Sequence, residues 1–255
     1  MRKIIQFFVK HVPRHQLHKI AHFAMILVSP FYRGSNFEDP INGKKYRKMF
    51  SYGRNNPRAN ALAPDSMSLE RHRLLWLFLR DRTNFTTENI KLLHLAPEYC
   101  FLKKFKKMNN LDVVTGDLYS PWADIKMDVH DIPFDNNSFD VLLGNHLLEH
   151  VDDDAKVMRE FYRVMKPGGW GIFQVPMDTT RQETYEDASI TDPKEREKHF
   201  WQEDHLRLYG LDYPKRLSAA GFEVVQVDLT SELDPKLVQR YSLPIGEIIY
   251  WCKKN

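Results

Sequence analysis

The stretch from Phe139 to Met177 constrains the fold most, because two apolar runs flank one amphipathic helix pattern. Residues 139–144 form an almost unbroken apolar run, which is typical of a parallel strand buried on both faces. Apolar residues at helical spacing follow from residue 157 and end before the breaker Pro167-Gly168-Gly169. A second apolar run covers residues 170–175. A crossover of this length makes the two strands parallel, so the sequence predicts an α/β domain.

Three motifs in this stretch carry a resemblance to a known family: FDVLL from residue 139, LEH from residue 148 and EFYRVMKPGG from residue 160. On these motifs the chain resembles the class I S-adenosylmethionine-dependent methyltransferases, in particular the type 11-like subgroup, over roughly residues 92–227. The resemblance implies an α/β fold with a Rossmann-like seven-stranded sheet and helices on both faces. It also implies S-adenosyl-L-methionine as the cofactor.

Composition and the resemblance together predict three parts of the chain. They are a basic amphipathic helical extension at residues 1–35, a metal-free zinc-ribbon-like lobe at residues 36–67, and the methyltransferase domain at residues 68–255. The charge distribution agrees with a division. Residues 1–58 hold twelve Lys and Arg against two acidic residues, whereas the remainder holds 25 against 32.

Cysteine content limits the location and the metal chemistry. Only Cys100 and Cys252 occur, so neither a disulfide framework nor a cysteine-based zinc site is expected. We therefore expect a reducing, cytoplasmic setting.

The first thirty residues interleave apolar side chains with Lys and His. No apolar run approaches the roughly 20 residues of a membrane span, and the pattern does not match a secretory signal. Two interpretations stay open. The extension is either a basic amphipathic pair of helices on an anionic membrane or acidic partner, which would place the protein peripherally at the inner membrane face, or a helical cover on the domain's own surface.

Four histidines in this extension have helical spacing: His11, His15, His18 and His22. Pro13 interrupts their register, and no carboxylate or cysteine joins them. We therefore predict no metal site in the chain.

Residues 37–79 resemble a small zinc ribbon that relatives in this subgroup carry before SLERHRLLW. Four residues stand where the resemblance places the ribbon's cysteines: Asp39, Asn42, Ala63 and Ser66. Ala63 and Ser66 are poor zinc ligands, so the lobe is expected to lack the metal and to be mobile or restructured.

Two acidic residues after predicted strands are the first candidates for cofactor binding. Asp117 follows the second strand, where an acidic side chain accepts hydrogen bonds from ribose hydroxyls in nucleotide-binding sheets. Asp128-Val129 resembles the family segment in which the Asp accepts from the adenine amino group and the next residue packs on the ring. An Asp at a strand end also commonly caps the following turn, so both positions keep a structural alternative.

The loop after the first strand, Ala96-Pro97-Glu98, replaces the usual glycine-rich loop and contains no glycine. The subgroup pattern LH-apolar-APE matches it, and the resemblance gives Glu98 the cofactor's amino group or a place near its sulfonium. Asn145 and His146 arrive at the end of the fourth strand. His146 is a candidate for cofactor contact or for a catalytic base.

The substrate side is expected after residue 199, where FWQEDHLRLYG resembles the subgroup pattern FGQ-x-DH-apolar-R-x-YG. Trp201 replaces the glycine of that pattern. Asp204, His205 and Arg207 form our catalytic candidate group, since a carboxylate, an imidazole and a guanidinium suit deprotonation and docking of an acidic substrate. A loop-anchoring network is the structural alternative.

The leading functional prediction is methyl transfer from S-adenosylmethionine to O, N or C of a small-molecule or lipid-linked acceptor. The alternative is a catalytically silent binding or scaffold module, which the absent cysteines, the glycine-free loop and Trp201 would suit. A nucleic-acid substrate is not favoured, because a basic patch without a recognised binding motif is weak support. The oligomeric state is not predicted.

Overall fold

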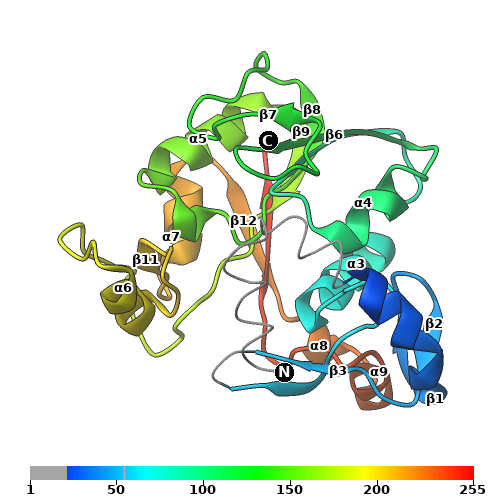
Figure 1. The fold of residues 1–255 in the computed structure, drawn as a ribbon. Coiled ribbons are helices and arrows are strands. Elements are labelled where there is room, and N and C mark those ends of the chain that lie inside the picture. The colour runs from blue at the N-terminus through cyan, green and yellow to red at the C-terminus, as the bar shows by residue number, and fades with distance from the viewer. Residues whose placement is uncertain (1–21, 54–55) are drawn as a thin grey trace. The chain divides into compact units, whose positions relative to one another are not determined.

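The computed structural model describes residues 22–53 and 56–255 (Figure 1). The chain divides into two compact units, each built from separate segments. The lobe unit comprises the described residues up to Thr86 together with Glu98–Lys104 and Asp228–Glu247. The sheet unit comprises Thr87–Pro97, Phe105–Val227 and Ile248–Asn255.

A seven-stranded mixed sheet forms the centre of the sheet unit, in the order β12-β13-β9-β8-β5-β6-β7. Its strands are β5 (Ile90–Leu95), β6 (Leu111–Asp117), β7 (Ile125–Lys126), β8 (Phe139–Leu143), β9 (Met165–Ile172), β12 (Glu223–Val227) and β13 (Ile249–Lys253). The neighbours from β7 to β9 pair in parallel, whereas β13 runs antiparallel to both β9 and β12. This is the predicted Rossmann-like methyltransferase sheet, including its antiparallel seventh strand.

One apolar core joins the sheet to the helices α5 (Asp154–Val164) and α7 (Tyr213–Ala219). The Asp153 side chain starts α5 by accepting a hydrogen bond from Lys156 N–H. Phe161 of α5 packs on Phe173 with ring centroids 4.8 Å apart. Helical spacing in the sequence therefore predicted the buried face of α5.

The strand after α5 begins earlier than the sequence predicts. β9 starts at Met165 and runs through Pro167-Gly168-Gly169, where we expected only a break. Its register with β8 shifts between Phe139 and Val141, and Gly168 adopts a φ of 79°. A glycine takes this left-handed conformation at little cost, so the breaker residues form an irregular strand start.

The remaining elements of the sheet unit are short: η2 (Leu148–His150), β10 (Tyr185–Glu186), α6 (Pro193–Phe200) and β11 (Arg207–Leu208). β10 and β11 pair antiparallel. β10 lies within the polar residues 178–199 that follow β9, and β11 lies after them.

The lobe unit contains two antiparallel hairpins, β1–β2 and β3–β4. Its elements are η1 (Ser29–Tyr32), β1 (Arg33–Asp39), β2 (Lys44–Tyr46), β3 (Phe50–Tyr52), β4 (Arg58–Leu62), α3 (Glu70–Arg82), α8 (Leu229–Glu232) and α9 (Pro235–Tyr241), and most of α4 (Tyr99–Phe105) belongs with them. Residues 22–28 are also helical.

Two of the positions that the zinc-ribbon resemblance singles out contact one another. The buried Asp39 carboxylate accepts a hydrogen bond from Ser66 Oγ at 2.5 Å and another from Ile41 N–H at 3.0 Å. Burial raises the pKa of Asp39 despite these bonds and the charge of Arg73. Arg73 is itself fully buried and donates to the backbone carbonyls of Ala61, Ser68, Tyr241 and others. A buried polar network therefore ties the ribbon-like segment to α9.

Of the predicted extension, residues 1–21 lie outside the described part of the chain, and with them three of the four histidines of the stripe; residues 22–35, including His22, are described. None of the helices in the described ranges has the length and apolar content needed to cross a bilayer.

Candidate cofactor and acceptor site

A cavity of about 630 Å³ opens at the carboxyl ends of the parallel strands β5, β6, β7 and β8. All of its lining residues belong to the sheet unit. They are Ala96, Gly116–Tyr119, Met127–His130, His146, Leu147, His150–Asp152, Asp204 and Leu206. Ligands of open α/β sheets bind at this edge, and the volume suits a nucleotide-sized molecule.

The glycine-free loop after β5 reaches the cavity through Ala96. Ala96 has a φ of 44°, in the left-handed region that glycine favours, and its N–H donates to Gly116 O at 3.0 Å. The backbone therefore makes the bend without a glycine, at a cost of roughly 1–2 kcal/mol. Pro97 and Glu98 do not line the cavity, and Glu98 belongs to the lobe unit.

Asp117 lines the cavity and also caps the turn that follows β6. Its Oδ1 accepts hydrogen bonds from Tyr119 N–H and Ser120 N–H, both at 2.6 Å. Both bonds use the same oxygen, so Oδ2 is left as an acceptor for a ligand. The structural and functional interpretations of Asp117 are therefore compatible.

Asp128 and Val129 line the cavity next to His130, a residue that sequence reasoning missed. Asp128 Oδ1 accepts from His130 N–H at 2.9 Å and lies 2.7 Å from His130 Nδ1. These hydrogen bonds lower the pKa of Asp128. His130 Nε2 lies 2.7 Å from Asp152 Oδ1 without forming a hydrogen bond, so the imidazole stands between two carboxylates on the cavity wall. The strand-end position of Asp128 predicted that residue, but no spacing rule linked His130 to Asp152.

His146 lines the cavity with a φ of 51°, again in the left-handed region. Its N–H donates to Gln174 O at 2.7 Å, and its Nδ1 lies 3.2 Å from Glu149 Oε1. Two non-glycine residues in strained conformations thus border one cavity, which is where such strain commonly occurs. Asn145 does not line the cavity. Its side-chain oxygen accepts from Gln174 N–H at 3.0 Å, which joins the ends of two strands.

Of our substrate-side group, Asp204 lines the cavity with a half-exposed side chain, whereas His205 and Arg207 do not line it. His205 is buried, and burial lowers the pKa of its imidazole. Arg207 is 3% exposed and donates to the carbonyls of Leu148, Val151 and Asp152 at 2.5–2.9 Å. Arg207 therefore braces the cavity wall from behind.

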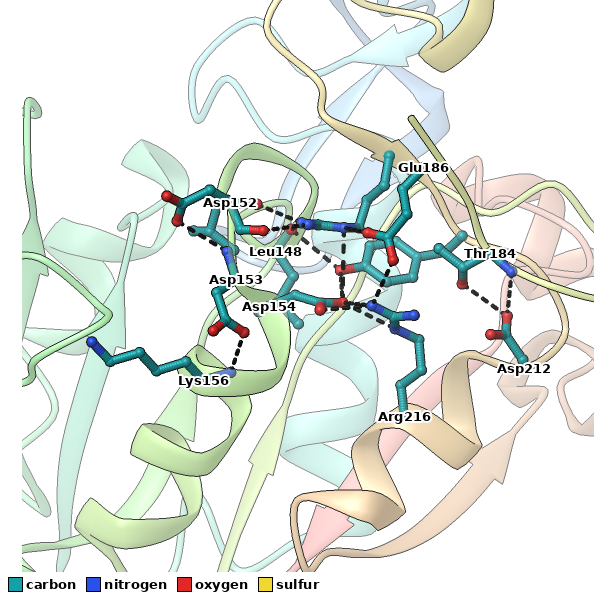
Figure 2. Close-up of polar contacts among 12 residues, drawn as sticks. Leu148, Asp152, Asp153, Asp154, Lys156, Thr184, Glu186, Asp212 and Arg216 are labelled. Carbon is teal, nitrogen blue, oxygen red and sulfur yellow. Dashed lines mark hydrogen bonds and ion pairs between the residues drawn. The ribbon is translucent and has the colours of Figure 1, made fainter. Parts of the chain in front are cut away.

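A second arginine completes this bracing network (Figure 2). Figure 2 shows Arg216 directed at the Asp154 carboxylate, which it contacts at 2.7 Å, while Tyr209 Oη donates to Asp154 Oδ2 at 2.8 Å. Burial raises the pKa of Asp154, but the hydrogen bonds of Arg216 and the charge of Arg207 outweigh it and lower the pKa overall. The first residue of α5 is thereby fixed to α7.

The backbone conformation at Trp201 explains why the subgroup pattern has a glycine at this position. Trp201 ends α6 with a φ of 73° and is 49% exposed. Glycine is the usual residue at such a left-handed helix end. Trp201 does not line the cavity, so the departure concerns the end of the helix.

Comparison with known proteins agrees with this architecture. Residues 94–173 match the model of a methyltransferase domain family. The chain is 35% identical over 65 residues to the ubiquinone/menaquinone biosynthesis C-methyltransferase UbiE of Idiomarina loihiensis, covering 24% of this chain and 26% of that protein. It is 27% identical over 212 residues to 2-methyl-6-phytyl-1,4-hydroquinone methyltransferase 1 of Oryza sativa subsp. japonica, covering 78% of this chain and 55% of the relative.

Among solved structures, the [4+2]-cyclase SpnF shares the fold with a TM-score of 0.52 and 16% sequence identity, over 92% of this chain and 95% of its own. The matched segments span about a quarter and about half of the two relatives above. Residues 94–173 thus match a methyltransferase domain family, and they lie within a sheet that has the class I methyltransferase fold.

Proposed function

We propose that the protein is an S-adenosylmethionine-dependent methyltransferase that acts on a small-molecule acceptor. One observation carries the proposal. Asp117 and Asp128, which end two neighbouring strands, line the same cavity and each has its hydrogen bonds concentrated on Oδ1. Two such acceptors on one wall match the ribose and the adenine amino group of a nucleoside cofactor.

The residues present fit S-adenosylmethionine. Asp117 would accept from the ribose hydroxyls and Asp128 from the adenine amino group, while Met127 and Val129 would pack on the adenine ring. Ala96 and His146 would border the methionine part. The cofactor supplies a methyl group on a positively charged sulfonium.

Positioning then provides most of the catalysis, because methyl transfer is an in-line displacement. The carbon–sulfur bond breaks as the bond to the acceptor atom forms, and the sulfur leaves with the electron pair as a thioether. His146 and Asp204 are the lining groups placed to orient the acceptor or receive its proton.

Cofactor binding tests the proposal directly, by calorimetric titration with S-adenosylmethionine and with its demethylated product. We expect micromolar binding, and a drop of about 10- to 100-fold for Asp117→Ala, because a hydrogen bond to a charged group contributes about 1.5–3 kcal/mol. Asp128→Ala should weaken binding similarly.

Asp187→Ala is the matched control, since Asp187 caps a turn through Oδ1 as Asp117 does but does not line the cavity. Equal affinities for wild type and the double variant of Asp117 and Asp128 would sink the cofactor assignment. No binding by wild type would favour a silent scaffold module.

For the acceptor, we propose a lipid-linked aromatic compound reached at a membrane surface. The names of two relatives support this, since they specify quinone biosynthesis and a phytyl hydroquinone. The basic extension at residues 1–35 would supply the membrane contact, ahead of a metal-free ribbon-like lobe at 36–67 and the methyltransferase domain at 68–255.

Liposome flotation tests this contact, using vesicles with and without anionic lipid. The comparison is between the full chain and a variant with five extension cations changed to Gln: Arg2, Lys3, Lys10, Arg14 and Lys19. We expect flotation of the full chain on anionic vesicles only, and its loss in the variant. Equal flotation of both proteins would remove the membrane proposal.

A further inference from the structure

Three side chains beside the cavity come together as candidate metal ligands: Glu149, His150 and His205. One ligand atom from each lies within 4.8 Å of those of the other two. Glu149 and His205 are each 1% exposed, whereas His150 lines the cavity. Leu206 N–H donates to Glu149 O at 2.8 Å and so holds the two chain segments together.

Hydrogen bonds fix which ring nitrogen of each histidine carries a proton. His205 Nδ1 lies 2.8 Å from Phe200 O, and His150 Nδ1 lies 3.2 Å from Asp204 O. Because a carbonyl oxygen only accepts, both Nδ1 atoms donate, and in the neutral imidazoles both Nε2 atoms keep their lone pairs. Metal-binding histidines are characteristically oriented by such a bond from the second ring nitrogen.

Two buried polar atoms in this cluster have no hydrogen-bonding partner among the described residues: His205 Nε2 and Glu149 Oε2. Leaving a buried polar atom unsatisfied costs about 1–3 kcal/mol, so native proteins contain few of them. A single cation bound by both atoms would satisfy them together. The rings of His150 and His205 are 4.8 Å apart and nearly perpendicular, so they are close enough to share an ion without stacking.

We propose that Glu149, His150 and His205 bind one first-row divalent metal ion, with Zn²⁺ as the preferred ion, and that an open coordination position faces the cavity. Two imidazoles and a carboxylate are a ligand set of catalytic zinc sites, which leave the fourth position to water or substrate. With zinc–ligand distances near 2.1 Å, tetrahedral ligand atoms are about 3.4 Å apart, so side-chain shifts of about 1 Å would close the site.

The position of the ion also leads to a prediction about the acceptor. This second prediction rests on the proposed function, whereas the prediction of metal binding does not. An ion held partly by the cavity-lining His150 would bind an oxygen of the acceptor. Metal binding lowers the pKa of a hydroxyl, so the acceptor would present a hydroxyl group, and its proton would pass to solvent before transfer.

Zinc titration of chelator-treated full-length protein tests the site. We expect the wild-type protein to bind one equivalent of zinc tightly. The zinc affinity should fall at least about 100-fold in Glu149→Gln, His205→Gln and His150→Gln, since even indirect partners of a metal change affinity 10- to 100-fold. His150→Gln is the decisive variant, because its partly exposed side chain can be replaced without disturbing the core. Thermal melting verifies that each variant is folded.

The control replaces the four extension histidines, at positions 11, 15, 18 and 22, by Gln. This variant should still bind one equivalent of zinc tightly. When Co²⁺ replaces zinc, the protein should show the absorption spectrum of a four- or five-coordinate ion with nitrogen and oxygen ligands. Unchanged zinc affinity in His150→Gln, or loss of the equivalent in the control, would overturn the metal site. S-adenosylmethionine titration of the same variants separates the two proposals, because either ligand can bind when the other fails.

Discussion

We expect replacement of Arg207 by Met to destabilise the cavity wall, because Arg207 has a structural role and not a catalytic one. The guanidinium donates to the carbonyls of Leu148, Val151 and Asp152, and these residues form the turn that carries His150. Tyr209 Oη lies 3.2 Å from Leu148 O, but its single proton is donated to Asp154 Oδ2 at 2.8 Å. The substitution therefore leaves all three carbonyls without the donor that Arg207 supplies.

The magnitude follows from these contacts. Each buried carbonyl left unsatisfied costs about 1–3 kcal/mol, and breaking a buried ionic network costs about 3–5 kcal/mol. We expect Arg207→Met to lower the free energy of unfolding by about 4 kcal/mol, which corresponds to a Tm lower by roughly 10 °C for a chain of this size. Arg207→Lys should recover little, because one ammonium cannot reach three divergent carbonyls.

Thermal melting and urea denaturation measure the effect, with Arg181→Met as the control. Arg181 pairs with Asp178 at 3.2 Å at the surface, so its loss should cost less than about 1 kcal/mol. A Tm for Arg207→Met within about 1 °C of wild type, together with a large loss of activity, would refute the bracing role and restore Arg207 as a catalytic candidate.

Three further predictions concern charge and backbone strain. Because its pKa is lowered, ionised Asp154 stabilises the fold above its unfolded pKa of about 3.9, and this contribution is lost as the pH falls through the folded pKa. Asp154→Asn should therefore cost more stability in urea at pH ~7 than at pH ~3, and an equal cost would contradict this. Asp39 has a raised pKa, so its contribution to stability is present below about pH 3.9 and is lost as the pH rises through the folded pKa. The stability of Asp39→Asn relative to wild type should therefore be higher near neutral pH than in acid. The reverse order in the same assay would count against this. Trp201→Gly should raise stability by up to about 1 kcal/mol, seen as a higher Tm, by removing the left-handed strain; a lower Tm would show that the exposed indole is needed.

The sequence predicted what depends on local pattern. An apolar run located β8 and helical spacing located α5, and strand-end positions singled out Asp117 and Asp128, which line the cavity. These features follow from periodicity and chain direction, which short windows of sequence contain.

Contacts between distant segments were not predictable in the same way. Arg207 has the residue type of a catalytic group, but its partners lie more than fifty positions earlier, and backbone carbonyls leave no mark in a sequence. The approach of His205 to Glu149 likewise depends on how the segment after α6 returns to the turn before α5. Helical spacing therefore singles out the extension histidines and gives no signal for this cluster.

The position of β13 bears on how the protein reaches its folded state. β13 follows β12 in the chain but inserts between β12 and β9, and β12 pairs with no other strand of the sheet. Until β13 arrives, β9 has an unpaired edge next to a nearly complete parallel sheet, and such an edge is a template for pairing with another molecule. Misassembly during synthesis or refolding should therefore begin at β9, and conditions that slow insertion of β13 should increase aggregation without altering the stability of the finished fold.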